Sequence, residues 1–106
     1  MEIESEGACR LIEKNKENPN FVIIDVRDPE EFGSGHVVGA INISLRSGDF
    51  EKKISSLDKD KAYLVYCLSG IRGSKAAAIM NKKGLRCSNV IGGISELESD
   101  GAEVSR

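Results

Sequence analysis

Residues 62–73 constrain the fold more than any other stretch, because a short apolar run passes there through a glycine-containing turn into a helix-like segment. The run from Ala62 to Tyr66 is apolar and aromatic, it ends at Cys67, and Arg72 opens the segment that follows. Such a run, with helical segments before and after it, predicts a parallel strand covered on both faces. Cys67 would then lie at the carboxyl end of this strand, where open α/β sheets place their chemistry.

The turn between Cys67 and Arg72 predicts a cradle for a negative charge. Gly70 supplies the backbone freedom for a sharp turn, and a helix starting near Arg72 leaves its first N–H groups without helical partners. These amides, the positive helix end and the guanidinium favour an anion at one point, so Cys67 is expected to be a nucleophilic thiolate. The interpretation requires a thiol that solvent reaches and amides that turn toward it. A buried, inert thiol is the alternative.

The composition and charge are those of one globular domain. The chain has 106 residues, 15 Lys plus Arg against 17 Asp plus Glu, and a formal net charge of −2. Neither nucleic acid nor an anionic membrane is therefore expected as a partner. No apolar stretch approaches the length of a membrane span, and the acidic N-terminus is unlike a signal peptide, so a cytoplasmic location is expected.

The cysteines predict neither a disulfide framework nor a structural zinc site. Cys9, Cys67 and Cys87 are odd in number and lack C-x-x-C spacing, so no metal site is expected. No cofactor is expected either. We expect Cys9 on a helix and Cys87 just before a strand, both as small structural hydrophobes.

Helices and strands are expected to alternate along the chain. Asp28 to Glu31 reads as a helix start, with a cap, a proline and a capping-box glutamate. Further helices are expected over residues 5–16, 49–57, 74–83 and 95–99, and further strands over residues 21–24, near 41–43 and over 89–91. This alternation predicts a mostly parallel sheet in a three-layer α/β/α domain.

Three motifs, in order and at suitable separations, resemble the rhodanese (sulfurtransferase) family over nearly the whole chain. They are Asp25-Val26-Arg27 followed by Glu31-Phe32 and Gly35-His36-Val37-x-Gly39-Ala40-x-Asn42-Ile43; Cys67-x-x-Gly70-x-Arg72; and Gly92-Gly93-Ile94. The resemblance implies a single rhodanese-like domain over residues 1–106, with a central sheet of about five strands.

The resemblance also implies a sulfurtransferase that carries a sulfane sulfur as a persulfide. Cys67 would be the nucleophile, and Arg72 would stabilise the charge. The backbone amides that hold the persulfide would be those of Leu68, Ser69, Gly70, Ile71 and Arg72. The donor would be thiosulfate or a persulfide, and the acceptor a thiophile such as cyanide, a thiol or a protein partner. Because Leu68 and Ile71 leave Arg72 as the one full positive charge in the loop, a protein persulfide or a less charged donor is favoured over thiosulfate.

Two other functions remain open. A cysteine-based phosphatase or arsenate reductase would use the same thiolate, but enzymes of that kind have five residues between cysteine and arginine, and this chain has four, Leu68 to Ile71. The third possibility is a non-catalytic interaction module, against which the retained cysteine argues.

The remaining polar residues of the first motif are expected to be structural. A pair of Cys67 with His36, the sole histidine, would suggest a hydrolase, but the family uses this position to anchor the loop after the short helix. Asp25 and Arg27 lie at a strand end, and Arg27 is expected to pair with Glu31 or another carboxylate.

Overall fold

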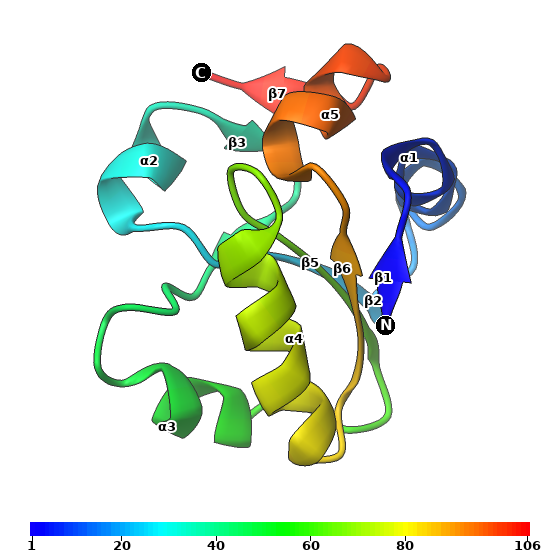
Figure 1. Cartoon of the computed structure of the whole chain (residues 1–106). Helices are drawn as coiled ribbons and strands as arrows, with labels where there is room; N and C mark the ends of the chain where they lie inside the picture. Colours follow the sequence, from blue (N-terminus) through cyan, green and yellow to red (C-terminus); the bar gives the residue numbers. More distant parts are fainter.

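A computed structural model describes residues 1–106, and a five-stranded sheet forms its centre (Figure 1). The strand order is β1-β6-β5-β2-β4, and every neighbouring pair is parallel. Their bounds are β1 Glu2–Ile3, β2 Phe21–Asp25, β4 Ile41–Asn42, β5 Ala62–Tyr66 and β6 Arg86–Val90. The predicted parallel sheet is therefore confirmed, with the apolar run ending at Cys67 as its middle strand.

Helices cover both faces of the sheet, which gives three layers (Figure 1). Helices α1 (Ser5–Lys14) and α5 (Gly93–Ser99) cover one face, α3 (Phe50–Ser55) and α4 (Ile71–Lys82) cover the other, and α2 (Pro29–Gly33) follows β2. Since side chains alternate along a strand, Tyr63 and Val65 pack with the α3 and α4 side, and Leu64 and Tyr66 with the α1 and α5 side. This burial on both faces explains why β5 is continuously apolar.

The structure corrects the sequence interpretation at the strands. Cys87 lies within β6, not before it, because that strand begins at Arg86 and ends at Val90. Because Ser88 and Asn89 are polar, the apolar pattern of the sequence does not show where β6 begins. The short strands β1, β3 (His36–Val37) and β7 (Val104–Ser105) were also not predicted; β3 and β7 form an antiparallel pair. A strand of two residues carries no periodic signal, and its existence depends on a distant partner.

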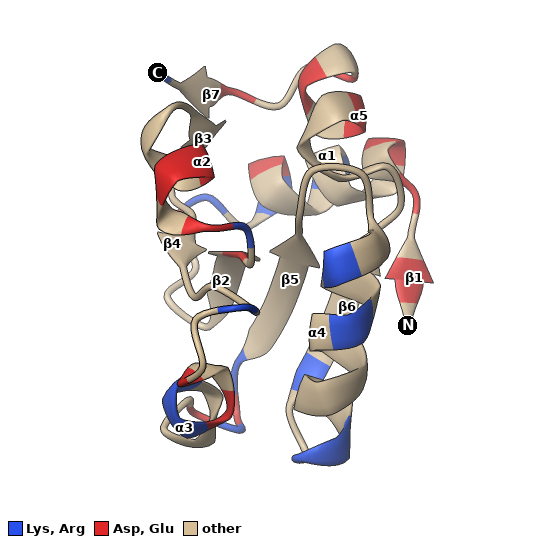
Figure 2. Cartoon of the chain, turned by 60° about the vertical axis from the view of Figure 1, so that its left-hand side comes forward, with Lys and Arg blue, Asp and Glu red and all other residues tan.

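The charged groups are unevenly distributed over the helices. Helix α4 carries basic residues and no acidic ones, whereas α2, α5 and β1 carry mostly acidic ones (Figure 2). None of the helices has both the length and the apolar character needed to cross a bilayer.

Candidate active site

The loop after β5 closes around the sulfur of Cys67. Gly70 has a φ of 111°, which permits the turn, and its amide donates a hydrogen bond of 3.0 Å to the Cys67 Sγ. The amides of Leu68, Ser69, Ile71 and Arg72 donate to no protein acceptor. The loop therefore has one amide bonded to the sulfur and four further N–H groups without a protein acceptor.

The enclosure of Cys67 differs from the sequence expectation. The residue is 1% exposed, although the cradle interpretation required a thiol that solvent reaches. Leu68 and Ser69, the next two residues, are exposed. The unloaded sulfur is thus enclosed, and a reagent reaches it only after local movement of the residues around it. Burial alone fits an inert thiol, but the hydrogen bond from Gly70 and the unpaired loop amides are features that a core thiol does not require.

Asn89, which the sequence interpretation did not single out, holds the loop from β6. Its Nδ2 donates to the carbonyl oxygen of Gly70 at 3.1 Å and to the carboxylate of Glu2, while the amide of Ser74 donates to the same carbonyl at 2.9 Å. Because the C=O and N–H of a planar peptide unit point in opposite directions, these bonds direct the N–H of Ile71 away from Asn89. The side chain is fully buried, so it fixes this peptide firmly.

Gly93 positions the other side of the loop. Its φ is 60°, and a Cβ built there would overlap the Cys67 carbonyl oxygen and lie 2.5 Å from the carbonyl carbon of Leu68. Only glycine lets α5 approach the backbone of the loop this closely. The approach allows the amide of Ile94 to donate to the Cys67 carbonyl at 2.9 Å. The last of the three motifs therefore meets the second one in space.

Arg72 is held by Glu31, which the sequence interpretation considered as a partner of Arg27. Its guanidinium forms a two-point ion pair with Glu31 of α2, with distances of 2.7 and 3.0 Å, and Glu31 also accepts from the amide of Asp28. The hydrogen bonds from Arg72 are the largest cause that lowers the pKa of Glu31 to about 2. The guanidinium is thus part of a partly neutralised pair and not an isolated charge.

The polar residues at the end of β2 brace one another. Asp25 and Arg27 are both buried and form an ion pair of 2.7 Å, and Arg27 also donates to the carbonyl of Gly35. Arg27 is therefore paired with Asp25, a carboxylate other than Glu31. His36 hydrogen-bonds to the carbonyl of Phe32 at 3.0 Å and stacks on its ring. None of these three side chains makes a hydrogen bond to Cys67.

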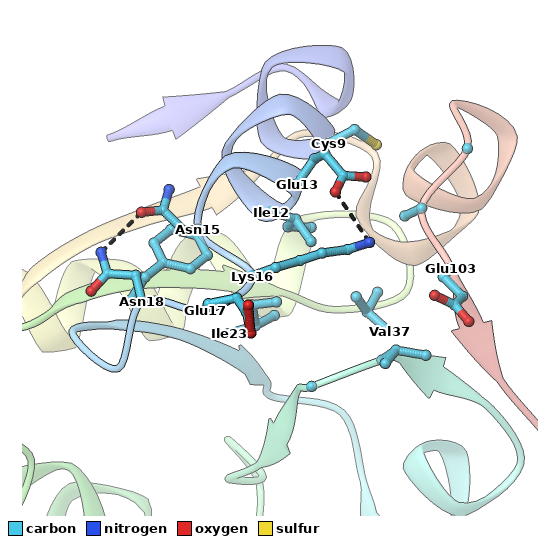
Figure 3. A pocket seen from close by; sticks show the side chains of 15 residues that line it. Cys9, Ile12, Glu13, Asn15, Lys16, Glu17, Asn18, Ile23, Val37 and Glu103 are labelled. Carbon is cyan, nitrogen blue, oxygen red and sulfur yellow. Dashed lines mark hydrogen bonds and ion pairs between the residues drawn. The ribbon is translucent and has the colours of Figure 1, made fainter.

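A hollow of the molecule lies away from this loop (Figure 3). It measures ≈ 630 Å³, and its walls come from α1, the start of β2, the β3 region and residues 101–103, with no contribution from residues 67–72. Cys9 lies at one end of it, and burial is the main cause that raises the pKa of this thiol. The side chains of Glu13 and Lys16, which both line it, form an ion pair. The neutral thiol fits the structural role expected of Cys9. Nowhere in the chain do three or more His, Cys, Asp or Glu side chains form a cluster that could hold a metal ion.

These features define a class of protein: a parallel α/β domain whose central strand delivers a cysteine into a short loop of backbone amides closed by an arginine. A family model for the rhodanese-like domain matches residues 10–100. The chain belongs to this family.

Relatives within the family include sulfurtransferases. The chain is 35% identical to the putative sulfurtransferase YtwF of Bacillus subtilis over 100 residues, which span 94% of this chain and 95% of that protein. It is also 45% identical over 64 residues to the dual specificity phosphatase Cdc25 of Arabidopsis thaliana, but that match spans 56% of this chain and 42% of the relative. The chain therefore resembles the sulfurtransferase over nearly its whole length and the phosphatase over little more than half of it.

A solved structure supports the same fold. The crystal structure of a rhodanese-related protein from Thermoplasma volcanium superposes with a TM-score of 0.81 at 28% sequence identity, covering 98% of this chain and 96% of that one. The three-layer α/β/α rhodanese-like architecture expected from the sequence is thereby confirmed.

Proposed function

We propose that the chain is a sulfurtransferase that carries a sulfane sulfur as a persulfide on Cys67, with residues 1–106 acting as one catalytic unit. The observation that carries the proposal is the 3.0 Å hydrogen bond from the Gly70 amide to Sγ, within a loop whose other amides have no protein acceptor. The terminal sulfur of a persulfide is a large, soft and partly negative atom. Several converging N–H groups stabilise such an atom without giving it a proton.

The proposed loading step needs no cofactor. The Cys67 thiolate attacks the sulfane sulfur of the donor and forms an S–S bond, while the bond inside the donor breaks and its electron pair leaves with the other fragment, which is sulfite when the donor is thiosulfate. In the second step the acceptor attacks the outer sulfur, and the electron pair of the Cys67–S bond returns to Sγ. The loop amides from Leu68 to Arg72 hold the outer sulfur between the two steps.

Arg72 is proposed to stabilise negative charge in the loop while Glu31 positions it. The two-point pair with Glu31 fixes the plane of the guanidinium. The remaining polar residues of the first motif, Asp25, Arg27 and His36, act only by bracing the neighbouring loop. Arg27 donates to Asp25 and to the carbonyl of Gly35, and His36 hydrogen-bonds to the carbonyl of Phe32, so none of the three binds the cysteine.

Intact-mass analysis tests the proposal. We incubate the wild type and Cys67→Ser with thiosulfate or mercaptopyruvate, and expect the wild type alone to gain the mass of one sulfur atom and to release thiocyanate on addition of cyanide. Cys87→Ser is the matched control, because that thiol is buried in β6 outside the loop. Equal sulfur uptake by Cys67→Ser would refute the assignment of the carrier.

A second candidate function is phosphatase activity, favoured by the partial similarity to Cdc25. Four residues separate Cys67 from Arg72. They form a tight ring of backbone in which the amide of Gly70 already donates a hydrogen bond to the Cys67 sulfur. Such a ring suits one sulfur atom better than a tetrahedral phosphate. We expect no turnover of an aryl phosphate, and a rate that depends on Cys67 would favour the phosphatase instead.

A further inference from the structure

Apolar side chains in and beside the proposed reaction loop are left exposed to solvent. Leu68 is 46% exposed, Ile71 is 71% exposed and Ile91 is 49% exposed. Leu68 and Ile71 belong to the loop, and Ile91 directly precedes the glycine pair that packs against it. We call these three residues the apolar rim. They are half of the large hydrophobic side chains that the chain leaves exposed, so their gathering at one place indicates a contact surface.

Part of the apolar rim forms a shallow hollow beside the loop. Ile71 and Ile91 line it together with the loop residue Ser69, Lys75 of α4 and Glu2 of β1, and it measures ≈ 380 Å³. A small anion such as thiosulfate would leave these isoleucines in water. A side chain from a larger molecule, placed next to its reacting sulfur, would cover them.

The basic face of α4 continues this surface away from the loop. Ile71, Lys75, Ala78 and Lys82 are all exposed, and their spacing places them on one face of the helix. Helix α4 has no acidic residue, and Lys75 and Lys82 form no ion pair, whereas Arg72 and Lys83 are paired with glutamates. Because the chain as a whole has a net charge of −2, this positive strip is a local feature that favours an acidic partner (Figure 2).

We propose that the apolar rim and the α4 strip dock an acidic protein that exchanges sulfur with Cys67 through a cysteine next to an apolar side chain. The inference rests on the proposed sulfurtransferase function. In transfer to such a partner, its thiolate attacks the outer sulfur of the Cys67 persulfide and forms a new S–S bond. The Cys67–S bond breaks, and Sγ leaves as the thiolate, so no oxidant or reductant is consumed.

The test compares two acceptors for the same loaded protein. One is cyanide, and the other is a synthetic peptide with a single cysteine flanked by leucines and then by glutamates. Peptides with serines for the leucines, or lysines for the glutamates, serve as controls. We expect Ile91→Ser to lower kcat/KM for the acidic leucine peptide about fivefold. Lys75→Glu should lower it about threefold at low salt and less at high salt. Both variants should discharge to cyanide like the wild type.

The matched control variant is Ile41→Ser, which removes a side chain of similar exposure, 43%, from the edge strand β4. It should discharge to both acceptors at the wild-type rate. Wild-type rates for Ile91→Ser and Lys75→Glu with the peptide would overturn the docking surface, as would equal losses with cyanide or no preference among the three peptides. Failure of the wild type to form a persulfide, or to release it to cyanide, would instead refute the proposed function itself.

Discussion

Gly73→Ala is expected to destabilise the protein through Asn89, although alanine normally favours a helix. Gly73 is buried in the first turn of α4, and a Cβ there would overlap Asn89 Oδ1 and lie 3.0 Å from its Cγ. Asn89 is fully buried, and its Nδ2 holds the carbonyl of Gly70. The added methyl group therefore displaces a side chain that anchors the cysteine loop.

The expected cost follows from three contributions. Overpacking costs about 1–3 kcal/mol, and weakening the buried hydrogen bond to Gly70 costs roughly 1 kcal/mol. The gain in helix propensity from glycine to alanine offsets about 0.5–1 kcal/mol. We expect a net loss of about 2 kcal/mol in the free energy of unfolding and a fall in Tm of about 8 °C, measured by urea and thermal denaturation.

Two matched variants isolate this mechanism. Gly7→Ala makes the same change inside α1, where the nearest atom to the new Cβ is 3.5 Å away on Ile3, and should stabilise the protein by about 0.5–1 kcal/mol. In the Asn89→Ala background the overlapping atoms are gone, so Gly73→Ala should cost much less there than in the wild type. The reasoning is refuted if Gly73→Ala is as stable as Gly7→Ala, or if its cost is the same with and without Asn89.

Further predictions concern the residues around the loop. Glu31→Gln should remove the charge that holds Arg72 and lower the free energy of unfolding by about 1 kcal/mol at pH 7. Since the pKa of Glu31 is lowered from 4.5 to about 2, its contribution to the free energy of unfolding is complete above pH 4.5 and disappears as the pH falls through 2. The stabilities of the wild type and the variant should therefore converge as the pH is lowered in a series of denaturation experiments. A difference that stays constant with pH would contradict the pairing. Gly93→Ala should abolish persulfide formation on Cys67, because its Cβ collides with the loop backbone; wild-type sulfur uptake measured by intact mass would contradict this. Burial raises the pKa of Cys87 to about 12, so iodoacetamide at pH 8 should leave it unmodified in the folded protein, and peptide mapping that finds it alkylated would show that β6 opens.

The sequence by itself determined the local elements near the site. The apolar run from Ala62 to Tyr66 indicated a strand covered on both faces, because it is short, contains aromatic and β-branched residues and is followed by a glycine turn. The order Asp28, Pro29 and Glu31 specified the start of α2, and Gly84 specified the end of α4. These signals act over a few residues, so the sequence shows them directly.

Only the tertiary structure decided which side chains surround the sulfur. Arg72 pairs with Glu31, 41 residues away, and Asn89 reaches Gly70, 19 residues away. Composition and periodicity do not say which carboxylate or amide the fold brings to the loop. The same holds for the close approach of Gly93 to the loop backbone, which depends on how α5 docks.

The enclosure of Cys67 was likewise decided only by the tertiary structure. The sequence predicted a cysteine at a strand end beside a glycine turn and an arginine, and the structure places all three there. Whether the loop leaves the sulfur open or covers it depends on packing between β5, β6 and α5, which no local signal encodes. A chain specifies its elements through short-range preferences, whereas the reach and exposure of a reactive atom follow from contacts that exist only once the layers have assembled.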